Sequence, residues 1–176
     1  NIYVAGYSES NSSNHTLDYT TIKYDSMGSP KWIQRYEGPA SSDDNATGIL
    51  VDINGNLIVT GSSIGNETRE DYCTIKYNTN GQVIWINRYN GPANFWDDAN
   101  AVNTDLSGNI YVTGGSFETN ASWYDFLTIK YDSSGNQIWI NRYNGPQNFY
   151  DMAKNVVIDM RKNVYVSGTS EGGRFD

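Results

Sequence analysis

The chain contains 176 residues, of which 38% are hydrophobic, 14% aromatic and only 18% charged, and its formal net charge is −8. So many aromatic side chains exclude a disordered chain, and the few, scattered basic residues exclude the positive patch on which nucleic-acid binding depends. No apolar run approaches the ~20 residues needed to cross a bilayer, so we expect no nucleic-acid partner and no membrane-spanning segment.

The predicted elements are short β-strands in groups of four, because β-branched and aromatic residues alternate between turn residues. In chain order, residues 1–37 hold three strands, and residues 46–89 hold four, at 46–52, 56–62, 71–77 and 82–89. Residues 99–143 repeat the group of four, and residues 153–176 repeat its first two. Gly55 and Gly108 stand in the first turn of a group, where a tight hairpin needs positive φ. Lys162 takes their place in the last group, so the lysine itself or Asn163 adopts that conformation, or the turn differs.

Two sequence frames repeat along the chain in one phase. The first frame reads DYTTIKY, DYCTIKY and DFLTIKY, and each copy is followed by a tryptophan. The second frame begins at residues 46, 99 and 153 and ends on VTG, VTG and VSG. The tryptophans Trp32, Trp85 and Trp139 lie 53 and 54 residues apart. A four-stranded antiparallel unit of this length is typical of a β-propeller blade.

We therefore predict an all-β fold: a β-propeller built of four-stranded antiparallel blades, as a single region over residues 1–176 with about 3.3 blades in this chain. Residues 1–37 and 153–176 are predicted partial blades, and residues 46–89 and 99–143 are predicted full blades. Because propellers close with ~4 to 8 blades, we expect the chain to be part of a larger ring, or copies to complete one another.

The combined motifs DYxTIKY, WxxRYNGP and DxxGNxYVTG resemble the SBBP family of bacterial β-propeller repeats over essentially the whole chain. The resemblance implies a secreted or cell-surface protein, often large and multidomain. It also implies that the repeat itself carries no catalytic residues.

Residues that recur in every repeat are predicted to belong to the scaffold, because each blade needs the same contacts with its neighbour. The recurrent tryptophans are expected to fill the interfaces between blades, together with Tyr36, Tyr89 and Tyr143. Recurrent aspartates are expected to cap turns, since their loops lack the spacing of calcium ligands: Asp44, Asp97 and Asp151. Recurrent basic residues are expected to pair with aspartates, with an anion-binding array as the alternative: Lys23, Lys76, Lys130, Arg35, Arg88 and Arg142.

Positions that differ between the copies are where a binding surface is predicted. In the connections between blades, Ser41-Ser42-Asp43 gives way to Asn94-Phe95-Trp96 and then to Asn148-Phe149-Tyr150. Aromatic pairs beside Asn and Asp are typical of sugar or protein contact surfaces, although such rings can also pack between blades. The candidate contact surface consists of Phe95, Trp96, Phe149, Tyr150, Phe117 and Trp123. The first strand of each group of four is the inner strand, and some of the residues that differ there are predicted to line a central channel. They are Thr47, Asn100 and Lys154 at one position and Leu50, Asn103 and Val157 at another.

Five sequons provide candidate glycosylation sites, which matter only in a secretory context: Asn11, Asn14, Asn45, Asn66 and Asn120.

Catalytic chemistry finds little support in the residues present. His15 is the only histidine and Cys73 the only cysteine, so no triad or His-rich metal site can form within this chain. We expect no catalytic residues, no metal and no cofactor.

The predicted function is a non-enzymatic module at an extracellular or cell-surface location. It would be a rigid scaffold for contacts with other proteins or glycans, or a component of a surface layer or filament built from further copies of itself. The alternative is a fragment of a propeller enzyme, a polysaccharide lyase or glycoside hydrolase, with catalytic groups partly outside this chain.

Overall fold

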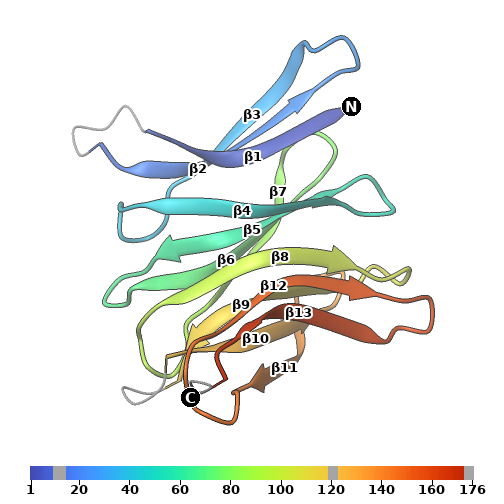
Figure 1. The fold of residues 1–176 in the computed structure, drawn as a ribbon. Coiled ribbons are helices and arrows are strands. Elements are labelled where there is room, and N and C mark those ends of the chain that lie inside the picture. Colours follow the sequence, from blue (N-terminus) through green and yellow to red (C-terminus); the bar gives the residue numbers. More distant parts are fainter. Residues whose placement is uncertain (10–14, 119–122, 173–176) are drawn as a thin grey trace.

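The fold consists of antiparallel β-sheets. The computed structural model describes residues 1–9, 15–118 and 123–172. The first sheet contains β1 (Ile2–Glu9), β2 (Leu17–Tyr24) and β3 (Pro30–Tyr36), and the second contains β4 (Asp44–Val51), β5 (Leu57–Ile64), β6 (Glu70–Tyr77) and β7 (Val83–Tyr89). The third contains β8 (Asp97–Thr104), β9 (Ile110–Phe117), β10 (Tyr124–Tyr131) and β11 (Gln137–Tyr143). The fourth pairs β12 (Asp151–Ile158) with β13 (Val164–Ser170). Figure 1 shows the sheets following one another in chain order, from blue to red.

The predicted all-β fold and the division into three, four, four and two strands are confirmed for these residues. Several strand boundaries differ from the prediction by one or two residues. The first strand of each complete group begins two residues earlier than expected, because Asp44 pairs with Ser63 and Asp97 pairs with Ser116. The second strand, β5, ends at Ile64, two residues later than expected. Among the described residues, no helix is long and apolar enough to span a membrane.

The hydrophobic core lies between consecutive sheets. One cluster joins Tyr19 of β2 to residues of the second sheet, and the other joins Tyr72 of β6 to residues of the third. Both tyrosines are 0–1% exposed. Each unit therefore buries its apolar face only by stacking on its neighbour, as repeat architectures require.

Tyrosines of β2 and β6 insert into the following sheet. The Tyr19 hydroxyl donates to the carbonyl oxygen of Cys73 at 3.2 Å, and the Tyr72 hydroxyl donates to that of Leu127 at 3.3 Å. A Cβ atom on Gly61 would lie 2.8 Å from the Tyr19 hydroxyl oxygen, so only glycine leaves room for this insertion.

The recurrent tryptophans occupy equivalent positions in successive sheets, as predicted. Trp32, Trp85 and Trp139 pair with Lys23, Lys76 and Lys130 of the neighbouring strand. Trp32 packs on the β6–β7 turn of the next sheet, where Gly81 has a φ of +84°. A Cβ atom on Gly81 would lie 2.8 Å from the Trp32 ring.

Thr47 and Asn100, two of the candidates for a channel lining, lie at β-bulges. The pairing register shifts at each of these residues, so each is the extra residue of a β-bulge in its inner strand. A bulge re-aims the side chain of its extra residue. Thr47 donates to the carbonyl oxygen of Ala99 at 2.6 Å, and Asn100 donates to that of Ala153 at 2.8 Å, so both link one inner strand to the next.

Lys162 itself adopts the left-handed conformation, with a φ of 67°. The first of the three outcomes left open by the sequence is therefore the one observed. Its ammonium group donates to the Ser107 hydroxyl of the preceding sheet at 3.0 Å.

Gly81→Ala is expected to lower the free energy of unfolding by about 3 kcal/mol, because a methyl group there meets the Trp32 ring as well as an unfavourable φ. Gly28→Ala is the matched control. Gly28 has the same φ region in the equivalent turn but no atom within 4 Å of the added Cβ, so we expect a loss of about 1 kcal/mol. Urea denaturation measures both, and equal losses would contradict the proposed packing of Trp32.

Lys162→Gly is expected to raise the free energy of unfolding by about 0.5–1 kcal/mol, because glycine adopts this φ without the cost that lysine incurs. Lys162→Ala keeps the unfavourable φ and loses the bond to Ser107, so it should be no more stable than the natural chain. Thermal unfolding followed by circular dichroism separates these cases. An equal gain in both variants would show that the lysine side chain, and not the backbone, is the source of strain.

Candidate interaction site

The two ends of the sheets differ in chemistry. Because strand direction alternates, the connections between sheets (37–43, 90–96 and 144–150) lie at the same end as the connections between the second and third strands of a group, of which 65–69 is fully described. We call this the loop end, which is on the left in Figure 1. The hairpin turns lie at the opposite end, the turn end, together with Lys23, Lys76 and Lys130.

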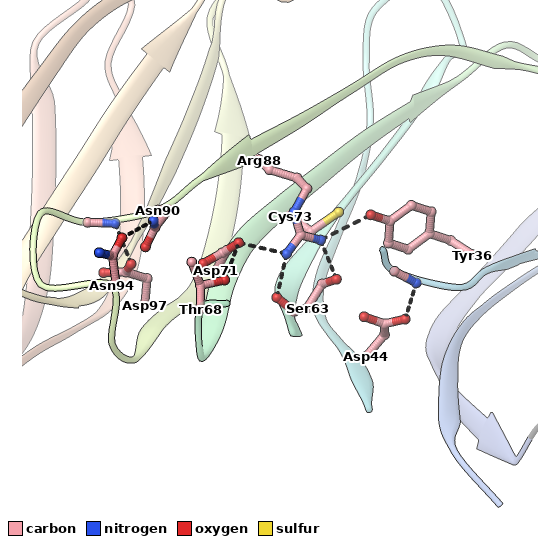
Figure 2. A network of polar contacts seen from close by, with 12 residues as sticks. Tyr36, Asp44, Ser63, Thr68, Asp71, Cys73, Arg88, Asn90, Asn94 and Asp97 are labelled. Carbon is pink, nitrogen blue, oxygen red and sulfur yellow. Dashed lines mark hydrogen bonds and ion pairs between the residues drawn. The ribbon is translucent and has the colours of Figure 1, made fainter. Parts of the chain in front are cut away.

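A row of polar side chains crosses the loop end of the second sheet. Arg88 of β7 donates to the Asp71 carboxylate at 2.8 Å, to the carbonyl oxygen of Ser63 at 2.7 Å and to the Tyr36 hydroxyl of the preceding sheet at 3.1 Å. Figure 2 shows these contacts around the guanidinium group. Asp44, at the start of β4, accepts the N–H of Gly38 at 2.6 Å. The residues of this row come from β4, β5, β6 and β7, and Asp44 links them to the connection that precedes β4.

The third sheet repeats this row. Arg142 contacts the Asp125 carboxylate at 3.4 Å, the Ser116 carbonyl at 2.8 Å and the Tyr89 hydroxyl at 3.3 Å, and Asp97 accepts the N–H of Gly91 at 2.5 Å. The predicted pairing with aspartates is therefore confirmed for Arg88 and Arg142, and the predicted capping is confirmed for Asp44 and Asp97. Arg35 instead donates to the carbonyl oxygen of Glu9 at 3.3 Å.

The recurrent lysines contact the scaffold. Lys23 and Lys76 each donate to a carbonyl oxygen of the next sheet, that of Thr79 at 2.7 Å and that of Ser133 at 3.2 Å. Lys76 also pairs with Asp52 at 3.1 Å, with both side chains almost fully buried. The ammonium groups of Lys23 and Lys130 lie 5.5 Å and 5.0 Å from the centres of the Tyr3 and Tyr111 rings. These contacts within the scaffold replace the anion-binding array considered from the sequence.

Four of the six predicted contact residues lie together. Ring centres are 4.2 Å apart for Phe95 and Trp96, 5.2 Å for Phe95 and Phe117, and 4.7 Å for Phe117 and Tyr124. Tyr150 extends the group, with its ring centre 5.6 Å from that of Tyr124. We call these five residues the aromatic cluster. It lies at the loop end, over the third sheet and the connection to the fourth.

The members of the aromatic cluster differ in exposure. Trp96 is 37% exposed, whereas Phe117 is only 9% exposed because the rings of Phe95 and Trp96 pack against it. The prediction of Phe117 as a contact residue is therefore wrong. Phe149 and Trp123 are 43% and 60% exposed and lie beside the cluster in sequence, outside the ring contacts found in the described part of the chain.

Tyr124 is the member that the sequence analysis missed. It stands where Leu17 and Glu70 stand in the other copies, just before the recurrent aspartate, so a comparison of differing positions could have found it. Its hydroxyl donates to the Asp98 carboxylate. Burial, this hydrogen bond and the charges of Asp98 and Glu70 raise the pKa of Tyr124. The hydroxyl therefore stays protonated and links the aromatic rings to an acidic neighbourhood.

A cation also contacts the aromatic cluster. The guanidinium carbon of Arg69 lies 5.9 Å from the centre of the Phe95 ring, within range of a cation–π interaction.

Two of the candidate glycosylation sites can be placed. Asn45 on β4 and Asn66 in the 65–69 loop are both exposed. The other three candidates, Asn11, Asn14 and Asn120, lie outside the described residues.

Comparison with known proteins finds propeller repeats. A family model described as SBBP, beta-propeller repeat, matches residues 31–67, from β3 to the loop after β5. The chain is also similar to the uncharacterized WD repeat-containing protein L264 of Acanthamoeba polyphaga mimivirus, with 30% identity over 149 residues. This alignment covers 76% of the chain and 10% of L264, so the chain spans about a tenth of its relative's length.

The buried aspartates of the loop end make stability depend on pH. Burial raises the pKa of Asp97 to about 6, and the nearby Asp71 charge adds to the effect. A carboxyl group whose pKa is raised by folding contributes stability at low pH, which is lost as the pH rises through the raised value. We therefore expect the free energy of unfolding to fall by about 2–3 kcal/mol between pH 4 and pH 8 through Asp97 alone.

Asp97→Asn should remove most of this decline, because the amide oxygen still accepts the Gly91 N–H and carries no charge. Asp105→Asn is the control, because folding shifts the pKa of Asp105 in the opposite direction. Although desolvation acts to raise it, the pKa of Asp105 is lowered by hydrogen bonds from Asn109, Tyr111 and Ser107. That variant should lose stability at neutral pH. Urea denaturation from pH 4 to pH 8 tests both, and an unchanged pH profile for Asp97→Asn would refute the assignment.

Proposed function

Because this chain carries the beta-propeller repeat of the SBBP family, we propose that it acts as a non-enzymatic scaffold whose loop end presents the aromatic cluster to a partner protein. The observation that carries this proposal is the position of the cluster. Its rings stand at positions that differ between repeats, on a frame whose recurrent residues are occupied by contacts between sheets.

The composition of this surface suits a protein contact. Tryptophan, tyrosine and arginine are enriched among the residues that dominate protein–protein binding energy. The cluster offers Trp96 and Tyr150, with Arg69 stacked beside Phe95 and Asp98 bound to Tyr124. Apolar rings with a polar rim are the usual anatomy of such interfaces.

The geometry of the rings favours protein over glycan. Phe95 is inclined by 48° to Trp96 and by 77° to Phe117. Rings at such angles form a corrugated apolar surface, not the flat platform on which a sugar ring stacks. Side chains of a partner protein can fit between them.

We also propose that the module acts at the cell surface or outside the cell. A surface rich in asparagine, with few charged residues and two exposed sequons at Asn45 and Asn66, supports this location.

A random peptide library displayed on phage and selected against the immobilised chain tests the proposed function. Peptides that bind through the aromatic cluster should lose at least about 10-fold in affinity toward the double variant Trp96→Ser/Phe149→Ser, as expected when exposed anchor residues are removed. Isothermal titration calorimetry with the synthesised peptides measures the change. Met27→Ser/Met160→Ser is the control, since both methionines are 90% exposed in turns at the turn end.

Two results would overturn the proposal. The selected peptides could bind the Trp96→Ser/Phe149→Ser variant as well as the natural chain. A glycan array could instead give a signal that needs Trp96 while no peptide binding needs it. Unchanged unfolding temperatures of the variants establish that the fold is intact.

A further inference from the structure

An exposed apolar side chain stands in the hairpin turn that follows each inner strand. Ile53, Leu106 and Met160 occupy the same position of the turns after β4, β8 and β12, directly after the aspartate of each turn. Their side chains are 72%, 74% and 90% exposed. We call these three residues the aliphatic row.

The turn itself does not require an apolar residue at this position. Its conformation is held by the aspartate, since the Asp52 carboxylate accepts the N–H groups of Asn54 and Asn56 at 2.9 and 2.8 Å. The outer hairpin turns are built around an aspartate or asparagine in the same way. They nevertheless hold a hydroxyl residue at the equivalent position: Ser26, Thr79 and Ser133. The apolar character is therefore specific to the inner turns, and the fold does not explain it.

The inner turns of the third and fourth sheets contact each other. The ammonium group of Lys162, in the turn after β12, donates to the hydroxyl group of Ser107, in the turn after β8. Close to these turns, the Asn103 side chain of β8 donates to the carbonyl oxygen of Val156 in β12 at 3.0 Å. Leu106 and Met160 therefore stand on neighbouring turns. Exposed apolar side chains that gather in this way mark interaction surfaces.

The aliphatic row and the aromatic rings stand at opposite ends of the same strands. Trp96 directly precedes β8 and Leu106 follows its end, while Tyr150 directly precedes β12 and Met160 follows its end. Figure 1 shows both strands running from the loop end to the turn end. A second copy displaced along these strands would therefore bring its aliphatic row onto the aromatic cluster of the first.

The two ends of the sheets also differ in charge. At the turn end, the basic residues slightly outnumber the acidic ones: Lys23, Lys31, Lys76, Lys130, Arg161 and Lys162 against Asp25, Asp52, Asp105, Asp132 and Asp159. The other acidic residues of the described chain lie at the loop end, where they far outnumber the basic ones. The formal net charge of −8 therefore arises at the loop end.

This division of charge selects one way of stacking. Two loop ends repel each other, because both are strongly negative. A loop end and a turn end are complementary instead. Arg161 and Lys162 are exposed directly beside Met160, and Glu67 and Asp98 lie at the loop end near the aromatic rings.

We propose that the aliphatic row of one copy packs on the aromatic cluster of a second copy, head to tail, with their inner strands in line. This inference rests on the proposed function and names the partner, which is another copy of the same scaffold. Because the contact joins two different surfaces, each added copy leaves one loop end and one turn end free. Such a contact propagates into a filament.

Sedimentation velocity of the chain at increasing concentration tests the proposal, and we expect assemblies that grow beyond a dimer. The turn-end variant Leu106→Ser/Met160→Ser should raise the dissociation constant at least about 10-fold, because it removes two apolar anchors. The loop-end variant Trp96→Ser/Phe149→Ser should do the same. The control Met27→Ser/Val83→Ser removes exposed apolar side chains from the outer hairpins of the turn end and should change the constant less than about 2-fold.

A mixture of the two weakened variants provides the sharpest test. The turn-end variant keeps an intact loop end, and the loop-end variant keeps an intact turn end. Neither should assemble alone, whereas the mixture should form a one-to-one pair that grows no further. Unchanged unfolding temperatures establish that both variants are folded.

Four outcomes would overturn this inference. The chain could stay monomeric up to ~1 mM, or the control could weaken assembly as much as the turn-end variant does. Full assembly of both weakened variants would instead indicate pairing between sheet edges, and a loop-end variant that still dimerises would indicate contact between two turn ends. Library peptides that require Trp96 while the chain stays monomeric would leave the proposed function standing and refute only this inference.

Discussion

The insertion of one aromatic ring over one glycine holds each sheet against the next. Tyr19 and Tyr72 reach across to main-chain carbonyl groups of the following sheet, over Gly61 and Gly114, whose missing side chains make room for the hydroxyl groups. In the third sheet, Phe126 occupies the same place over Gly168 without a hydroxyl. The burial of the ring is therefore the constant part of the contact, and the hydrogen bond is an addition to it.

This contact separates the residues that build the frame from those that can vary. Because the insertion fixes the distance between sheets, the tryptophans, bulges and arginine rows can repeat with it and keep the same partners. The connections at the loop end have no part in that packing. Phe95 and Trp96 can therefore replace the Ser42 and Asp43 of the earlier copy without disturbing a strand.

Repetition explains how much could be predicted from the sequence. Three copies of one pattern determined the strand order, the positions of the tryptophans and the exceptional turn at Lys162. What the sequence could not show are contacts with other parts of the chain. A bulge turns Thr47 and Asn100 toward carbonyl groups of the next inner strand, and no spacing in the sequence indicates these bonds. Phe117 was mistaken for an exposed ring because its cover, Phe95 and Trp96, comes from a different connection.

The negative charge of the loop end, by contrast, follows from the repeat. Each complete sheet places two buried aspartates at the loop end against one arginine: Asp44 and Asp71 against Arg88, and Asp97 and Asp125 against Arg142. The uncompensated charge therefore accumulates with every sheet in the stack, whereas the aromatic rings occur at one place. Long-range attraction or repulsion of a partner protein would then be a property of the whole scaffold, and the choice among partners a property of the local rings, because charge governs encounter while buried apolar anchors govern dissociation.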